Sequence, residues 1–162
     1  MAAYRNASLA APEGDPYDIR RQASERLRRT PSPRPAEAFR LSLEGWRRLA
    51  RKDVSGAAAA LEQSLTINPR DPVARYRYGR VQATRGAPAE ALAQFEQTIR
   101  DARTCPAPIL GAAYVEAAQL LERLNRRSEA LSAYRVAATL FGASADTHRA
   151  AARAIARLEK AR

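Results

Sequence analysis

Apolar residues recur along the middle of the chain at intervals of three or four positions, and turn residues separate these runs. Ala57, Leu61 and Leu65 have the spacing that places side chains on one face of an α-helix. Asn68-Pro69 predicts the end of that helix, because proline pushes the preceding residue out of helical geometry. Arg85-Gly86-Ala87-Pro88 predicts a further turn. The pattern therefore predicts an all-α chain of short amphipathic helices.

Two stretches of the chain superimpose on each other at an offset of 34 residues, the difference between positions 45 and 79. The matched positions hold residues of similar size: Gly45 and Gly79, Ala57 and Ala91, Leu61 and Phe95, Ser64 and Thr98. A third copy follows at an offset of 39 residues, at Ala118, Ala130 and Tyr134. A fixed period in this range indicates a stack of helix hairpins.

These repeats resemble the tetratricopeptide repeat. The resemblance implies an all-α, right-handed α-solenoid of about three hairpins, at about residues 38–71, 72–105 and 111–143 of a repeat region at 37–143. A capping helix is predicted at 144–162, with Ser144 or Asp146 as its N-cap. Residues 1–29 are predicted to hold a half-repeat helix and an extra helix, and 30–36 a proline-rich linker.

The first residues of the chain resemble the second helix of a repeat, because Ala3–Ala7 matches Ala133–Ala137 in pattern. Such a helix lacks its first partner and leaves an apolar face around Tyr4 and Leu9 uncovered. Our hypothesis is that a second copy of the chain, or upstream sequence, covers this face. The alternatives are that the helix predicted at 17–29 folds over it, or that the first residues are loose.

In tetratricopeptide proteins the first helices of successive repeats line a concave groove that holds a peptide or a partner helix. The resemblance places nine residues of this chain in that groove: Phe39, Trp46, Leu49, Val73, Tyr76, Arg77, Arg80, Val115 and Gln119. An alternative is that the stripe of Phe39, Leu43, Trp46 and Ala50 packs on the helix predicted at 17–29. Some family members hold a C-terminal carboxylate with lysines and asparagines. Because Ser42, Trp46, Tyr76 and Val115 stand at such positions here, we do not expect that mode of binding.

The chain is strongly basic, with a formal net charge of +11, and all but two of its 28 basic residues are arginine. The basic residues are densest between Arg20 and Lys52. An arginine-rich surface suits acidic partners or nucleic acid, which is the alternative function we keep beside groove binding. The other interpretation is that most arginines lie on solvated helix faces.

No catalytic, cofactor or metal-binding constellation is evident. Cys105 is the only cysteine and His148 the only histidine, too few ligands for a zinc site. The glycines form no phosphate-binding loop, and no apolar run approaches the length of a membrane helix. We therefore expect a non-enzymatic scaffold or adaptor without cofactors, most simply cytoplasmic, whose partner is another protein or peptide.

Overall fold

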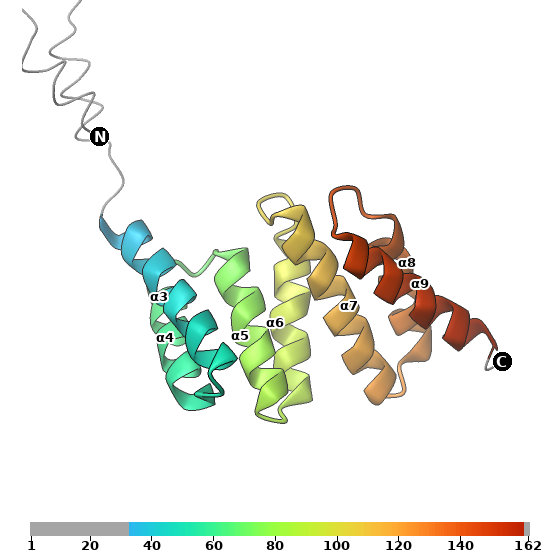
Figure 1. Cartoon of the computed structure of the whole chain (residues 1–162), viewed down its shortest axis with the longest axis horizontal. Helices are drawn as coiled ribbons and strands as arrows, with labels where there is room; N and C mark the ends of the chain where they lie inside the picture. The colour runs from blue at the N-terminus through green and yellow to red at the C-terminus, as the bar shows by residue number, and fades with distance from the viewer. Residues whose placement is uncertain (1–32, 161–162) are drawn as a thin grey trace, which may run out of the picture. The chain divides into compact units, whose positions relative to one another are not determined.

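The computed structural model describes residues 33–160, and every regular element among them is an α-helix (Figure 1). The helices are α3 (Pro33–Ala50), α4 (Val54–Ile67), α5 (Pro72–Thr84), α6 (Pro88–Arg100), α7 (Ala107–Arg123), α8 (Arg127–Thr139) and α9 (Ala145–Lys160). The two helices predicted within residues 1–29, with Tyr4 and Leu9, lie outside the described residues. The predicted all-α solenoid is confirmed for the described part of the chain.

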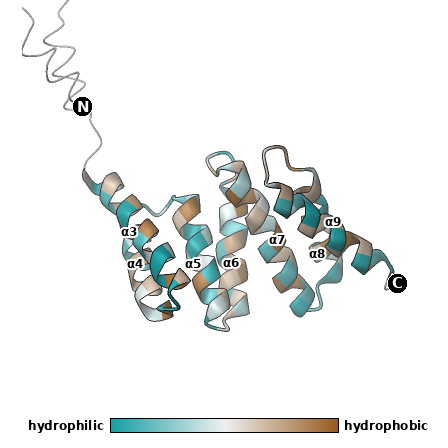
Figure 2. Ribbon diagram, viewed as in Figure 1, coloured by the Kyte–Doolittle hydropathy of each residue, from teal (hydrophilic) through white to brown (hydrophobic). Residues whose placement is uncertain are grey.

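The helices pack as three hairpins, α3–α4, α5–α6 and α7–α8, and α9 then packs on α8 (Figure 1). Successive hairpins meet where the second helix of one contacts the first helix of the next, as α4 contacts α5 and α6 contacts α7. Each helix carries both hydrophobic and hydrophilic residues (Figure 2). The buried hydrophobic side chains form two clusters, one between α4 and α5 and one that extends from α5 to α9, so successive hairpins share buried contacts.

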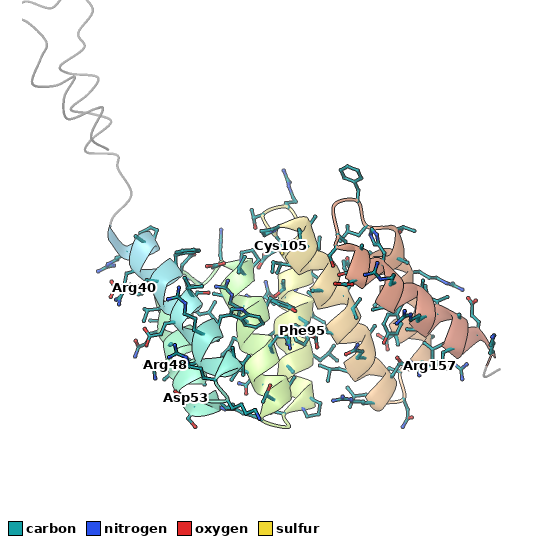
Figure 3. All side chains as sticks on the ribbon, viewed as in Figure 1. Arg40, Arg48, Asp53, Phe95, Cys105 and Arg157 are labelled. Atoms are coloured by element: carbon teal, nitrogen blue, oxygen red, sulfur yellow. The ribbon has the colours of Figure 1, made fainter. Side chains whose placement is uncertain are left out.

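Within the first two hairpins, a glycine of the first helix lies directly against a large side chain of the second. A Cβ atom on Gly45 would be 2.6 Å from Cγ of Leu61, and one on Gly79 would be 2.7 Å from Cε1 of Phe95. Phe95 is fully buried at this contact (Figure 3). These two positions therefore need a residue without a side chain, which is the physical reason for the repeated glycine.

Side chains cap several helix starts. Asp53 precedes α4 and accepts a hydrogen bond from the backbone N–H of Gly56 at 2.9 Å. Asp71 precedes α5 and accepts from the backbone N–H of Val73 at 2.9 Å. Of the two caps considered for the last helix, Ser144 fills the role, since its Oγ accepts from the backbone N–H of Thr147 at 3.1 Å. Such caps satisfy N–H groups that have no partner inside the helix.

Two predicted breaks at prolines begin a helix instead. Helix α3 starts at Pro33, inside the predicted linker at 30–36, and α7 starts at Ala107, before the predicted repeat start at 111. Both corrections have one cause. Proline is tolerated in the first turn of a helix, because the N–H that it lacks would have no intrahelical partner there. The prolines therefore mark helix beginnings here, and part of the five-residue lengthening of the third repeat lies in α7.

A hydrogen-bonded carboxylate ties the last three helices together. Glu122 of α7 accepts from Tyr134 of α8 at 2.7 Å and from Arg157 of α9 at 2.9 Å (Figure 3). Burial opposes ionisation of Glu122, but the hydrogen bonds from Arg157 and Tyr134 outweigh it and lower the pKa of the carboxyl group. Burial and the same carboxylate raise the pKa of Tyr134. The charged carboxylate and the neutral phenol are therefore the stable pair at neutral pH.

Replacing Gly79 by alanine tests the close approach of the helices. Alanine favours a helix over glycine by about 1 kcal/mol, yet its methyl group would meet the buried Phe95 ring. We expect Gly79→Ala to lower the free energy of unfolding by about 1–3 kcal/mol, measured by urea denaturation. Ala59→Gly, at an exposed position of α4, is the matched control for propensity alone. A stabilised Gly79→Ala protein would contradict the packing role of this glycine.

Replacing Glu122 by glutamine tests the carboxylate network. At neutral pH we expect Glu122→Gln to lower the free energy of unfolding by about 1 kcal/mol, because a charge-assisted hydrogen bond is lost. A carboxyl group whose folded-state pKa is lowered stabilises the fold above its unfolded-state pKa, and that stability is lost as the pH falls through the folded-state value. Wild type and variant should therefore converge in acid.

Urea denaturation at pH 7 and at pH 3 measures this convergence. Glu159→Gln is the control, because the Arg135–Glu159 ion pair is exposed and should contribute little at either pH. A difference between wild type and Glu122→Gln that persists unchanged in acid would show that the charge of Glu122 is not what matters.

Candidate functional site

A groove crosses the first helices of the three hairpins. Its first part is a pocket of about 580 Å³, lined by Trp46, Leu49, Ala50, Lys52, Val54, Arg80 and Thr84. Its second part, about 190 Å³, is lined by Arg80, Ala83, Thr84, Glu116, Gln119, Leu120 and Arg123. The two parts share Arg80 and Thr84 of α5, so they form one groove from α3 to α7.

The only tryptophan of the chain lies in the first part of the groove, next to two arginines. The Cζ atom of Arg80 is 5.5 Å from the centroid of the Trp46 ring, and that of Arg77 is 5.9 Å away. At these distances each guanidinium is attracted by the electrons of the indole ring. The arginines belong to α5 and the tryptophan to α3, so the contact joins two successive repeats.

Further polar contacts hold the two arginines in place. Arg77 donates a hydrogen bond to Oγ of the buried Ser42 at 2.7 Å, and Nε of Arg80 forms an ion pair with Glu116 at 3.3 Å. Burial lowers the pKa of Arg77. Burial also acts against Arg80, but Tyr76 and Glu116 outweigh it and raise the pKa of that guanidinium. Arginine stays charged under all ordinary conditions, so the groove presents fixed positive charge beside an aromatic ring.

Several residues predicted for the groove do line it. Trp46, Leu49, Arg80 and Gln119 are among its lining residues, and Arg77 contacts the Trp46 ring.

The other four predicted residues are placed differently. Tyr76 and Val115 are only 6% and 8% exposed, and the Tyr76 ring packs on Phe95 with 5.8 Å between centroids. They therefore belong to the core, which corrects their predicted position on an open surface. Phe39 is 62% exposed and Val73 is half-buried, and neither lines the pocket beside Trp46.

Four polar residues of the groove lining were not among the nine predicted residues: Lys52, Thr84, Glu116 and Arg123. Helical spacing could have predicted three of these four, because each lies one turn from a residue already placed in the groove. Thr84 lies one turn after Arg80, and Glu116 and Arg123 lie one turn before and after Gln119. Lys52 had no such signal, because it lies in the α3–α4 turn, where its φ angle of 65° is the left-handed conformation.

The sequence also allows a different contact for the stripe of Phe39, Leu43, Trp46 and Ala50, namely packing on the helix predicted at 17–29. That helix lies outside the described part of the chain. This contact stays a prediction. Within the described residues, Trp46 is half-buried and Phe39 is exposed, so the stripe retains accessible apolar surface.

The described residues bring together no catalytic group. Cys105 is buried, and this burial, aided by Asp101 and Asp71, raises the pKa of its thiol to about 11, so the thiol is protonated and unreactive at neutral pH. The His148 ring instead contacts the backbone carbonyl of Leu140 at 3.0 Å. Between residues 33 and 160 no group of three or more histidine, cysteine or acidic side chains is arranged to hold a metal ion. None of the described helices is long and apolar enough to cross a membrane.

Comparisons with known proteins agree with this fold. The N-terminal domain of stress-induced protein-1 (STI-1) from C. elegans has a TM-score of 0.67 and 14% identity, with 80% of this chain and 99% of that chain covered. The Sgt2 TPR domain from Aspergillus fumigatus has a TM-score of 0.64 and 22% identity, with 82% and 83% covered. The TPR2B domain of yeast Sti1, in a structure of its pHsp70 complex, has a TM-score of 0.66 and 19% identity, with 78% and 99% covered.

No curated protein sequence matches the chain at a significant level. The family model described as "Tetratricopeptide repeat" matches residues 48–109, which extend from the end of α3 to the start of α7. The matched segment contains the whole second hairpin, including Gly79 and Phe95. Residues 48–109 therefore match the tetratricopeptide repeat, and the described helices have the fold of tetratricopeptide-repeat domains.

Proposed function

We propose that this chain is a non-catalytic interaction scaffold that binds a segment of a partner protein in the groove across α3, α5 and α7. One observation carries the proposal: Trp46 lines an open pocket beside the charged groups of Arg77 and Arg80. A tryptophan beside arginines is the combination enriched in the residues that contribute most to protein–protein binding.

The chemistry of the groove favours a partner segment with an apolar side chain next to acidic ones. Trp46, Leu49 and Val54 offer apolar surface in the first part of the groove. Lys52, Arg80 and Arg123 bring positive charge to its lining, and the lining carboxylate, Glu116, is already paired with Arg80. An apolar side chain would pack on Trp46, while carboxylates beside it would be attracted by the surplus positive charge.

The similar structures support partner binding in general terms. The TPR2B domain of yeast Sti1 was solved in complex with pHsp70, so a domain of this fold holds another protein's segment. Its identity to this chain is 19%, which supports the fold and does not transfer the partner. The groove of this chain is instead built around a tryptophan, two arginines and a glutamate from three helices.

Affinity capture from a lysate of the source organism tests the groove. We expect Trp46→Ala to lose, by about tenfold or more, proteins that the wild type retains, because truncating a central aromatic anchor costs at least about 1–2 kcal/mol of binding. Phe141→Ala is the matched control, since Phe141 is an aromatic residue that is 97% exposed and lies in the turn between α8 and α9. Thr84→Glu is a second groove variant that removes no packing, because Thr84 is exposed.

The expected result is that Trp46→Ala and Thr84→Glu lose the same proteins, while Phe141→Ala keeps them. All variants should retain the helical circular-dichroism spectrum of the wild type. If the two groove variants capture the same proteins as the wild type, the groove is not the binding site. If only Phe141→Ala loses them, the turn between α8 and α9 is the interaction surface instead.

A further inference from the structure

The side of α3 that faces away from α4 carries a row of arginines where later helices carry small or apolar residues. Alignment at the 34-residue offset matches Arg40 with Ala74 and Arg47 with Val81 of α5. Ala74 and Val81 are fully buried and pack in one cluster with residues of α4. Arg40 and Arg47 are exposed. The face that joins one hairpin to the preceding one is thus charged on α3, and we name it the outer face of α3.

Every other first helix of the stack receives a second helix on the corresponding face. Helix α5 contacts α4, α7 contacts α6, and α9 contacts α8. Helix α3 is the first helix among residues 33–160, so no described second helix precedes it (Figure 1). Within residues 33–160, the outer face of α3 therefore corresponds to the position against which a preceding second helix packs elsewhere in the stack.

The outer face of α3 also contains a concave site. A pocket of about 420 Å³ is lined by Arg40, Leu43, Glu44, Arg47, Arg48, Arg51 and Asp53. The apolar Leu43 is half-buried at this pocket. The pocket therefore offers one apolar contact among charged side chains, of which Arg40, Arg48 and Asp53 are labelled in Figure 3.

The charges of this pocket do not cancel. Arg48 forms ion pairs with Glu44 at 2.7 Å and with Asp53 at 3.4 Å, which uses both carboxylates of the pocket. Arg40, Arg47 and Arg51 form no ion pair with any residue in the described part of the chain. The guanidinium groups of Arg40 and Arg47 on α3, and of Arg51 in the turn that follows it, thus remain available to an external carboxylate. Arginine binds a carboxylate through two parallel hydrogen bonds.

We propose that the outer face of α3 is a docking site for an acidic amphipathic helix of a partner protein. The helical form follows from the position that a preceding second helix would occupy, and the acidic chemistry follows from the three arginines. Arg40 and Arg47 are about 10 Å apart along the α3 axis, at a rise of about 1.5 Å per residue, and Arg51 lies just beyond the helix end at Ala50. Glutamates or aspartates two turns apart on the partner helix match the spacing of Arg40 and Arg47.

Two other occupants fit this face less well. The last helix of a second copy exposes Arg149, Arg153 and Arg157, which would repel the arginines of the outer face. A nucleic acid has phosphates for the arginines but no aliphatic side chain to place against Leu43. An acidic helix can direct its carboxylates to the three arginines and an apolar side chain to Leu43. This surface is separate from the groove, whose lining residues on α3 are Trp46, Leu49 and Ala50.

Binding of a designed peptide to the full-length chain tests the proposal. The probe is a fluorescently labelled helical peptide with leucines every three or four residues and flanking glutamates, and its control carries glutamines in place of the glutamates. We expect Arg40→Glu/Arg47→Glu/Arg51→Glu to weaken binding of the glutamate peptide by about tenfold or more, measured by fluorescence anisotropy. Arg100→Glu/Arg103→Glu/Arg153→Glu is the matched control, with the same change in net charge at exposed positions elsewhere.

The proposal holds if the α3 variant loses the glutamate peptide, the matched control keeps it within about threefold, and the glutamine peptide binds weakly. Equal losses in the two triple variants would overturn it, because net charge alone would then explain binding. Absence of binding to the wild type would also overturn it. The proposal would also be overturned if Thr84→Glu, the groove variant, lost binding of the glutamate peptide while the arginine-to-glutamate variant of α3 retained it.

Two further measurements distinguish the remaining explanations: binding of RNA, and binding of the peptide to a variant that removes the charges without reversing them. Oligouridylate RNA that binds with the same arginine dependence, while the peptide does not bind, would make this face a nucleic-acid surface and overturn the assignment. If charge reversal disturbs the circular-dichroism spectrum, Arg40→Gln/Arg47→Gln/Arg51→Gln is the alternative variant. It removes the charges without adding repulsion and should still weaken binding of the glutamate peptide. Because these measurements do not use Trp46, they can fail while the proposed groove function stands.

Discussion

The structure depends on how closely the two helices of each hairpin approach each other. At Gly45 and Gly79, a single added carbon would lie less than 3 Å from a core side chain of the opposite helix. Such contacts set the separation of the paired helices, and interiors packed at this density do not yield to an extra methyl group without strain. Ala118 takes the corresponding position in the third hairpin, where the buried partner is Tyr134.

The groove is a consequence of the same packing. Once one face of α3, α5 and α7 is committed to the hairpin contact and another to the neighbouring repeat, a third face remains for solvent or for a ligand. Trp46, Arg80 and Glu116 lie on these remaining faces, one on each helix, and Arg80 contacts both of the others across the repeats. The contacts preorganise the groove, which lowers the ordering cost that a bound segment would otherwise have to overcome.

The repeat period and the helices were predictable from sequence because they depend on spacing, and spacing is visible without coordinates. How deeply each side chain is buried was harder to predict from the sequence. Tyr76 and Trp46 both lie on first helices and were both expected in the groove, yet Tyr76 is buried against Phe95 while Trp46 stays half-buried. Their difference arises from how far the neighbouring hairpin covers each position, a tertiary property that periodicity does not report.

The proline-rich segments show a second limit. The sequence predicts a linker at 30–36 and a third repeat from 111, whereas α3 begins at Pro33 and α7 at Ala107. A proline is compatible both with the end of one helix and with the first turn of the next, so its position alone does not distinguish them. The Arg77 and Arg80 contacts with Trp46 were also hidden, because residues 31 or more positions apart meet only when the repeats stack. The resemblance to the tetratricopeptide repeat supplied the stacking order, and hence the correct helices for the groove.

Site-specific photocross-linking from the groove tests the central claim most directly. A photoreactive benzoylphenylalanine at position 83 would lie in the groove lining, and the same residue at position 136 would lie on α8, where Val136 is 41% exposed and outside the groove. Illumination in source lysate should join a partner segment to position 83 and not to position 136, and Trp46→Ala should abolish the product. Partner proteins joined at position 136 alone, or equally at both positions, would show that the groove is not where a partner binds.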